Sequence, residues 1–358
     1  MDKSLLFLPD ISGYTKFIQT TEVEHSQHVI SELLEILIAA NTEELKLAEI
    51  EGDALFFYKE EEIPSQERLL AQIEAMFTAF YSHLELLKKN RICPCQACAT
   101  APNLELKIIA HAGVLQHIEV QGNRKPFGQQ VIEAHRLLKN SVSSNNYTLI
   151  SRGLALEIQL SQYYSSKLFR FRKGADTYDG KELEYLFSHI EKDNLKLTQF
   201  SGTKEVKFDR PPNLFAKKEF PIEATELMEY ITNLVYRKEW VKGVERFDYD
   251  PNQVTRQGTE HVCVVNGKHL NFVAVTKPVQ NDQLVYGELN TDIPLIDKVY
   301  QFYIIIPLTE KTCQLEVEIY WEAKSFFKRI MMALIGERSF KKNMLQAING
   351  LYSFVVAK

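Results

Sequence analysis

The 358-residue sequence predicts an α+β protein with two domains, an α/β sandwich followed by an antiparallel sheet around a long terminal helix. Three observations predict this fold class. Strand and helix patterns alternate in the first half, which is typical of a sheet covered by helices. The second half contains one helix pattern, a series of strand patterns and a long amphipathic stretch at its end. The length also exceeds what one hydrophobic core usually supports.

The boundary between the domains is predicted from a change in composition. Residues 191–213 are rich in polar and charged side chains and contain Pro211-Pro212, which is typical of a linker. We therefore expect a first domain over residues 1–190 and a second domain over residues 214–358.

Hydrophobic spacing predicts the elements of the first domain in order. Residues 4–9 form an apolar run that is broken at Pro9, as a buried strand before a loop would be. Gly52-Asp53 lies between two apolar runs and predicts a tight hairpin. We expect helices over 26–47, 66–89 and 130–140, a loop over 122–128, and strands within 47–58, 104–120, 147–151, 167–172 and 183–188.

The second domain is expected to begin with a helix over 225–236 and to end with a long helical stretch over 325–356. Between these helices the apolar and polar residues alternate, which predicts strands of an antiparallel sheet. The expected strands cover 244–250, 258–266, 269–277, 283–291, 299–308 and 312–322.

Composition excludes several classes of protein. The net charge is −5, so there is no general basic field to attract nucleic acid or anionic lipid. No apolar run approaches the roughly 20 residues that a membrane-spanning helix needs, and the first residues lack the pattern of a signal peptide. The chain has 5 cysteines, which is an odd number and is typical of reduced thiols or a metal site. We expect a soluble cytoplasmic protein without a transmembrane segment.

Two aspartates are candidate metal ligands. Asp10 follows the first apolar strand, and Asp53 lies at the tip of the predicted hairpin. Carboxylates at strand ends suit Mg²⁺, which prefers oxygen ligands, and Gly13 would let the backbone approach a phosphate. The alternative is that both aspartates only form turns, for which Asp is a common residue.

Four segments together resemble class III nucleotidyl cyclases, the family of adenylyl and guanylyl cyclases. They lie in the family's order, and the likeness covers about residues 1–190. The segments are 8–17 (LPDISGYTKF), 49–54 (EIEGDA), 111–114 (HAGV) and 127–137 (FGQQVIEAHRL). The resemblance implies a ferredoxin-like α/β sandwich and an active site shared between two chains of a homodimer.

The same resemblance implies functional residues. Asp10 and Asp53 match the family's two metal aspartates, and Ile11 matches the residue whose backbone carbonyl binds metal. Arg136 matches the arginine that stabilises the phosphates in the transition state. The implied cofactors are two Mg²⁺ or Mn²⁺ ions, and the implied substrate is a nucleoside triphosphate. Such metals lower the pKa of the attacking hydroxyl, while the arginine neutralises developing charge.

Two departures from the family pattern bear on activity and specificity. Ile132 stands where active members usually have an asparagine that contacts the ribose, so turnover is in doubt. Glu49 and Lys125 occupy the purine-reading positions, where adenine-specific members have lysine and aspartate. A carboxylate at position 49 favours guanine over adenine. The alternative is that Glu49 and Lys125 form an ordinary ion pair across strands.

A cysteine cluster is a second candidate metal site. Cys93, Cys95 and Cys98 lie within a stretch that is an insertion relative to the usual cyclase domain. Soft thiolates close in sequence suit Zn²⁺ or an iron–sulfur centre, but a structural site wants four ligands. His83, His111 or a residue of a second subunit would complete it. The other histidines, including His25, form no pattern, and the alternative is a loop of reduced, partly buried thiols.

The second domain resembles the START-like, polyketide-cyclase-like superfamily, also called SRPBCC. The likeness is carried by 220–224 (FPIEA), 237–240 (RKEW), 258–261 (GTEH), the strand series and the terminal helix. It implies a helix-grip fold around an apolar cavity, and thus an apolar small molecule or lipid as ligand. The alternative is that the many aromatic residues simply fill the core.

Three functions are consistent with these patterns. The first is a cyclase-like signalling protein that binds nucleotide and metal, has lost most catalysis and is coupled to a domain for a hydrophobic ligand. The second is an active homodimeric nucleotidyl cyclase that prefers GTP over ATP. The third is a carrier of a small hydrophobic ligand in which the cyclase fold serves only for dimerisation. Because Asp10, Asp53 and Arg136 are present while Ile132 is not asparagine, we favour the first.

Overall fold

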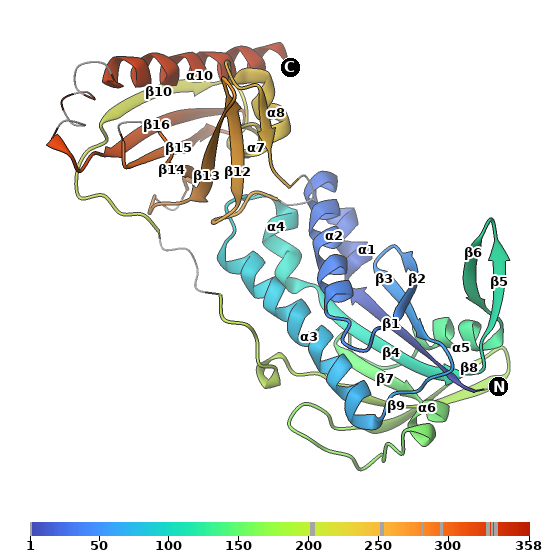
Figure 1. Ribbon diagram of the computed structural model, residues 1–358. Coiled ribbons are helices and arrows are strands. Elements are labelled where there is room, and N and C mark those ends of the chain that lie inside the picture. The colour runs from blue at the N-terminus through green and yellow to red at the C-terminus, as the bar shows by residue number, and fades with distance from the viewer. Residues whose placement is uncertain are drawn as a thin grey trace. The chain divides into compact units, whose positions relative to one another are not determined.

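The computed structural model describes residues 2–200, 205–250, 254–280, 282–293, 296–326, 330, 332 and 336–358 (Figure 1). The chain forms two compact units. The first contains residues 1–86 and 100–200, and the second contains residues 87–99 and 201–358. Each unit has a seven-stranded sheet with helices, so the predicted α+β class is confirmed.

The sheet of the first unit has the strand order β2-β3-β1-β4-β7-β9-β8. Its first four strands follow the β-α-β-β-α-β pattern of a ferredoxin-like sandwich, and all their pairings are antiparallel. Its strands are β1 (Ser4–Ser12), β2 (Lys46–Glu51), β3 (Ala54–Lys59), β4 (Glu105–Gly113), β7 (Tyr147–Ser151), β8 (Arg172–Tyr178) and β9 (Lys181–His189).

Strand β1 is the centre of the first unit because it is paired on both sides and buried on both faces. Leu6 and Leu8 point to the face covered by α5, where Ala134 and Leu137 join the same hydrophobic cluster. The helices are α1 (Tyr14–Thr20), α2 (Val23–Ala39), α3 (Gln66–Lys89), α4 (Gln96–Thr100), α5 (Gln129–Leu137) and α6 (Arg152–Glu157).

Three expectations for the first unit are wrong. The helix expected over 26–47 ends at Ala39, and strand β2 begins at Lys46. Residues 122–128 are not a loop, because β6 (Asn123–Phe127) pairs with β5 (Gln116–Val120) in a hairpin that projects from the unit (Figure 1). Most of its side chains are exposed, so the hairpin lacks the apolar alternation that signals a strand. Residues 167–172 form no strand before Arg172, and their apolar side chains are instead buried in the connection to β8.

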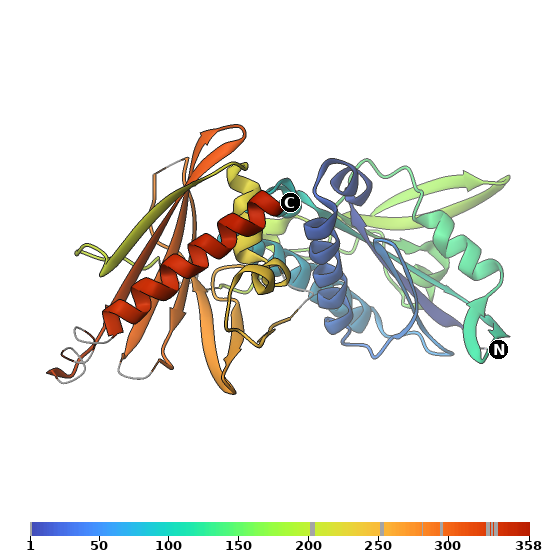
Figure 2. The ribbon, with the colours of Figure 1, turned by 90° about the horizontal axis from the view of Figure 1, so that it is seen from above.

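The second unit is an antiparallel sheet crossed by a terminal helix, in the order β10-β16-β15-β14-β13-β12-β11. Figure 2 shows α10 running across this sheet beside β10. Its elements are β10 (Leu214–Phe220), α7 (Ala224–Thr232), α8 (Leu234–Trp240), β11 (Arg246–Asp248), β12 (Glu260–Val265), β13 (Lys268–Val275), β14 (Leu284–Asn290), β15 (Lys298–Thr309), β16 (Thr312–Glu322) and α10 (Glu337–Ala357).

The core of the second unit lies between α10 and one face of the sheet. Tyr303, Ile305 and Val317 from the sheet share a cluster with Ile348 and Leu351 of α10. The helix expected over 225–236 is two helices, because Asn233 leaves the helical conformation and its side chain accepts a hydrogen bond from the Val235 N–H. Residues 327–329, 331 and 333–335 of the expected terminal helix lie outside the described residues.

A charged pair is buried in this core. Arg237 of α8 holds the Glu288 carboxylate of β14 by two hydrogen bonds, one of them 2.8 Å long, and Tyr286 Oη donates to the same carboxylate at 2.8 Å. Although burial alone would raise it, the Arg237 guanidinium holds the pKa of Glu288 below its ordinary value. The two side chains therefore neutralise each other, which offsets the cost of burying their charges.

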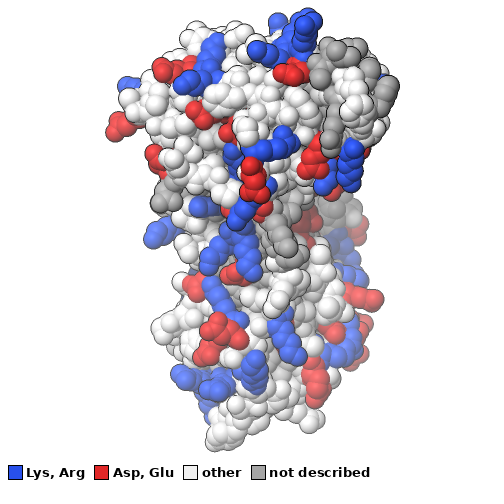
Figure 3. Space-filling model, turned by 90° about the vertical axis from the view of Figure 1, so that its left-hand side faces the viewer, with Lys and Arg blue, Asp and Glu red and all other residues white. Residues whose placement is uncertain are grey.

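The protein surface carries mixed charge. On the face shown in Figure 3, acidic and basic side chains are interspersed, in keeping with the net charge of −5. Among the described residues, no helix combines the length and the apolar character needed to cross a membrane.

We predict that Glu288→Gln lowers the free energy of unfolding by about 3–5 kcal/mol, because it leaves the buried Arg237 guanidinium without its counter-charge. Urea denaturation of the full chain measures this. The control is Asp248→Asn, which breaks an exposed pair with Arg246 and should leave the free energy of unfolding nearly unchanged. Equal losses for the two variants would contradict the role of the pair.

Candidate metal and nucleotide site

Strand register brings the two predicted metal aspartates together. Asp10 on β1 lies opposite Ala54 of β3, and Asp53 directly precedes Ala54 in the tight β2–β3 turn. The Ile11 N–H donates to the carbonyl oxygen of Asp53 at 3.1 Å, which fixes the turn against β1. Gly13 then adopts a left-handed conformation with φ of 91°, which turns the chain into α1.

Burial and neighbouring charge affect the ionisation of the Asp10 and Asp53 carboxylates. Burial raises the pKa of Asp10, and the Lys107 ammonium, 3.5 Å from Asp10 Oδ1, partly offsets that effect. Burial and the nearby charge of Asp10 raise the pKa of Asp53 to about 6. Two carboxylates that disfavour each other's charge form a set of hard oxygen ligands, which fits a divalent cation such as Mg²⁺ or Mn²⁺.

Lys107 is a site residue that sequence reasoning missed. It lies on β4 directly opposite Asp10, and its Nζ also donates to the Leu138 carbonyl oxygen at 3.3 Å. In the sequence, the one sign of this role was a lysine within a largely apolar strand. Its position opposite Asp10 depends on the β1–β4 register. Lys107 supplies one positive charge where the resemblance places metal.

The predicted purine-reading residues also lie together. Lys125 Nζ on β6 is 3.1 Å from Glu49 Oε2 on β2, and both side chains are close to half-exposed. The ion pair left open as an alternative therefore exists. An ion pair at this position leaves both groups accessible to a ligand, because neither is buried in the core.

Arg136 lies on α5 and pairs with Asp179 in the turn between β8 and β9. Within the described residues, Arg136 forms no hydrogen bond or ion pair with Asp10 or Asp53. Ile132, one turn earlier on α5, is 52% exposed. An exposed apolar side chain at this position offers no hydrogen bond to a ribose hydroxyl.

The three predicted cysteines lie close together. The Sγ atoms of Cys93, Cys95 and Cys98 all lie within 4.8 Å of one another. His83 and His111, the expected candidates for a fourth ligand, bind elsewhere. His83 Nε2 lies 3.1 Å from Glu32, and His111 contacts Ser151 and Gln130. The expectation for these two histidines is therefore wrong.

The cysteines are held close by the backbone and by burial. The Cys95 N–H donates to Cys93 Sγ at 3.5 Å, and the Cys98 N–H donates to Cys95 Sγ at 3.4 Å. Hydrogen bonds with Cys95 and Cys98, together with burial, raise the pKa of the Cys93 thiol. Three thiols gathered in this way could ligate a metal ion, and they suit a soft or borderline metal.

Comparison with known sequences gives a family without an assigned activity. The family model described as "Protein of unknown function (DUF2652)" matches residues 30–147. An uncharacterized protein of Mycobacterium tuberculosis, Rv2561/Rv2562, is 34% identical over 125 residues. That match covers 34% of this chain, and the chain spans 57% of the relative's length.

Solved structures similar to parts of the chain include two cyclase domains. The guanylyl cyclase domain of a rhodopsin fusion protein from Blastocladiella emersonii has a TM-score of 0.38, with 15% identity over 53% of this chain and 98% of its own. The adenylyl cyclase CyaB of P. aeruginosa has a TM-score of 0.38, with 18% identity over 54% and 96%. A norcoclaurine synthase mutant from Thalictrum has a TM-score of 0.32, with 12% identity over 40% and 93%.

Asp53→Asn is predicted to stabilise the metal-free protein at pH 7–8. Because the folded state raises the pKa of Asp53 to about 6, stability falls as the pH rises from about 4 to about 6, and asparagine removes this cost. After a discount for solvent screening, the gain is about 1 kcal/mol, or about 2–4 °C in Tm.

The same variant should lose the rise in Tm that Mn²⁺ gives the wild-type chain, because a metal ligand is missing. Differential scanning calorimetry with and without Mn²⁺ measures both effects. Asp179→Asn, at an exposed carboxylate, is the control and should respond to Mn²⁺ like the wild type. A full Mn²⁺ response of Asp53→Asn would rule out Asp53 as a ligand.

Proposed function

We propose that the first unit is a cyclase-like signalling domain that binds a nucleoside triphosphate with divalent cations at Asp10 and Asp53. The observation that supports this proposal is the pairing of β1 with β3. It places Asp10 opposite Ala54, so Asp10 lies close to the neighbouring Asp53. The Asp10 and Asp53 carboxylates and the Ile11 backbone carbonyl would hold the cations. When bound, Mg²⁺ or Mn²⁺ would neutralise phosphate charge and lower the pKa of the attacking hydroxyl.

Residues of the chain itself would select the nucleotide. Glu49 Oε2 can accept hydrogen bonds from the N1–H and the 2-amino group of guanine, and Lys125 Nζ can donate to O6. Their 3.1 Å separation supports this role, since one purine edge can contact both. The proposed preference is therefore for GTP over ATP.

Low turnover is part of the proposal. Ile132 gives no hydrogen bond to orient the ribose, so the attacking hydroxyl would be held poorly, and a small misplacement costs much of the rate. Arg136 would act on the phosphates held by a second chain of a homodimer, and its pairing with the exposed Asp179 leaves it at the surface of its own chain. The alternative is an active homodimeric cyclase. In it the same residues would contact the nucleotide, but the reaction would be faster.

We predict that the purified protein binds GTP in Mn²⁺ more tightly than ATP, as measured by calorimetry, and forms little cyclic nucleotide, as measured by mass spectrometry. Asp53→Asn should abolish the binding, while Asp179→Asn should leave it unchanged. Tighter binding of ATP would overturn the purine assignment, and nucleotide binding that survives Asp53→Asn would overturn the metal assignment.

Turnover is tested with the same assay. Ile132→Asn should increase the yield of cyclic GMP if the missing ribose contact limits the reaction. Rapid formation of cyclic GMP by the unmodified chain would instead favour the active cyclase.

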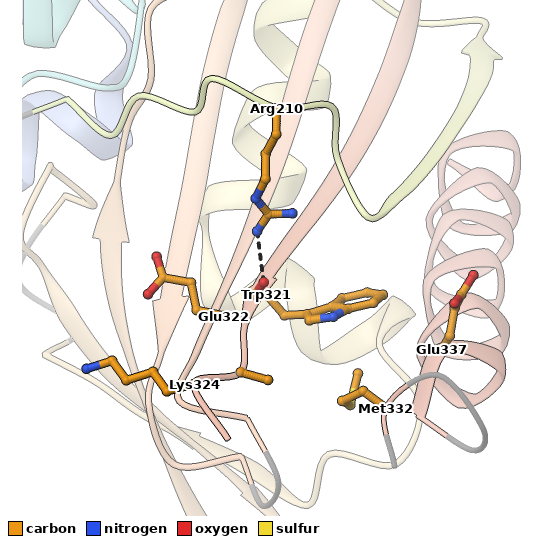
Figure 4. Close-up of a pocket in the computed structure, with 7 residues that line it drawn as sticks. Arg210, Trp321, Glu322, Lys324, Met332 and Glu337 are labelled. Atoms are coloured by element: carbon orange, nitrogen blue, oxygen red, sulfur yellow. Dashed lines mark hydrogen bonds between the residues drawn. The ribbon is translucent and has the colours of Figure 1, made fainter. Parts of the chain in front are cut away.

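A second candidate function concerns the second unit. A cavity of about 480 Å³ lies at one end of its sheet, with Trp321, Met332, Arg210 and Lys324 among its lining residues (Figure 4). Glu322 and Glu337 also line it, so the cavity is more polar than an apolar ligand alone would require. An amphipathic molecule, with its chain on Trp321 and an anionic group near Arg210 or Lys324, suits this lining.

Oleate is a suitable probe of this cavity. We predict that oleate changes the tryptophan fluorescence of the full chain, and that Trp321→Phe removes the change because Trp240 is buried away from solvent. Lys324→Ala should weaken binding about five-fold, as loss of one exposed ion pair would. No fluorescence response, with no co-purified ligand in native mass spectrometry, would contradict a carrier role.

A further inference from the structure

We infer that the second unit contains an aromatic cage that binds the methylated ammonium group of a small molecule. The walls of the cage are the rings of Tyr230, Tyr236 and Phe354. The ammonium of Lys358 fills the cage in this structure and is the competitor that a ligand must displace. All four residues belong to the second unit, and the inference does not rest on the proposed nucleotide function.

Three helices bring the rings together. Tyr230 lies on α7, Tyr236 on α8 and Phe354 near the end of α10, which lies beside α8 (Figure 2). The ring centroid of Tyr230 is 5.2 Å from that of Tyr236 and 5.2 Å from that of Phe354, both in edge-to-face contact. The Tyr236 and Phe354 centroids are 6.3 Å apart and their rings are tilted. Because the rings are not stacked face to face, each keeps one face open to a ligand.

Lys358 shows that a cation fits among these faces. Its Nζ lies 4.8 Å from the Tyr230 ring centroid, 4.3 Å from that of Tyr236 and 5.1 Å from that of Phe354. Each distance is within the roughly 6 Å over which an aromatic face attracts a cation. One ammonium over three ring faces is the arrangement of the aromatic cages that recognise quaternary ammonium groups.

The cage is anchored in the core of the unit. Tyr230 is 6% exposed, and Tyr236 and Phe354 pack on the same hydrophobic cluster. The Tyr230 carbonyl oxygen accepts a hydrogen bond from Trp240 Nε1 at 2.9 Å, which joins α7 to the end of α8. The rings therefore keep their positions without Lys358, and binding of a ligand requires little ordering of side chains.

The chemistry of the cage favours a methylated ammonium over a primary one. Within the described residues, Lys358 forms no ion pair with a carboxylate, so its ammonium is held by ring faces alone. A primary ammonium is strongly hydrated and needs hydrogen-bond acceptors that ring faces supply poorly. A methylated ammonium keeps the charge, donates fewer hydrogen bonds and buries its methyl groups against the rings.

A hydrogen bond also strengthens one wall of the cage. Tyr230 Oη donates to Glu226 Oε1 at 2.6 Å. Donation to a carboxylate increases the electron density of the phenol ring, which favours a cation over its face. The Glu226 carboxylate thus acts on the ligand through the Tyr230 ring.

The rest of a ligand has room beside the cage. Phe354 also lines a cavity of about 650 Å³ between the end of α8 and α10, together with Trp240 and Ser353. Gln346 and Asn349 belong to the same lining and offer hydrogen bonds to a hydroxyl group. Choline, which combines a quaternary ammonium with one hydroxyl, is therefore a suitable probe.

The first test is a choline titration of the full chain, followed by the nuclear magnetic resonance signals of isotopically labelled tyrosine rings. Lys358→Ala removes the competitor and should bind choline about ten-fold more tightly than the wild-type chain. Lys341→Ala removes an exposed lysine elsewhere on α10 and should bind choline like the wild type. An affinity that Lys358→Ala does not increase would overturn the inference.

The second test removes one wall in the Lys358→Ala background. Tyr236→Leu keeps an apolar side chain but loses the ring face, so the affinity for choline should fall about ten-fold. Tyr352→Leu is the matched control, because Tyr352 is a half-buried tyrosine of α10 that contacts Lys218 instead of Lys358. It should leave the affinity unchanged. Equal affinities of Tyr236→Leu and its parent would exclude the cage as the binding site.

The third test identifies the ligand chemistry and needs no wall variant, so it decides the matter even if Tyr236→Leu fails to fold. It compares choline with its neutral isostere, in which a tert-butyl group replaces the trimethylammonium group. Lys358→Ala should bind the isostere about ten-fold more weakly, because the isostere has the same shape but no charge. Equal affinity for the two compounds, or no choline binding at millimolar concentrations, would contradict a cation site.

Discussion

The antiparallel register between β1 and β3 is the constraint on which the candidate nucleotide site depends. It sets Asp10 opposite Ala54 and so brings the Asp10 and Asp53 carboxylates together. Because β1 is buried on both faces, a shift of one residue would exchange the side chains that pack on its two sides. The packing of the core therefore holds two acids in a position where burial raises the pKa of both and the charge of Asp10 further raises the pKa of Asp53.

The two candidate metal sites separate by ligand chemistry. Asp10 and Asp53 offer hard oxygen ligands, and Lys107 lies beside Asp10. Such ligands suit a divalent cation that binds and dissociates together with a phosphate ligand. The cysteine set offers soft sulfur ligands that are buried or half-buried, which suits a soft or borderline metal.

The second unit contains a buried ion pair and, separately, a cavity with a partly polar lining. Arg237 and Glu288 fix α8 to the sheet within the core, where their mutual neutralisation offsets the cost of burial. The cavity at the end of the sheet combines Trp321 with the charged side chains of Arg210 and Lys324. The aromatic residues of this domain suggested a large apolar cavity. Several of them, including Tyr286 and Tyr303, are instead packed in the core.

The sequence by itself determined the elements with strong periodicity: α3 and β7 have the expected bounds, and the hairpin at Gly52 is where its turn residues predict it. Local spacing suffices there because each side chain's environment repeats along the element. Tertiary structure alone decided that β5 and β6 form an exposed hairpin and that Lys107 faces Asp10. These relations connect residues far apart in the chain, and only strand register and helix packing bring such residues together.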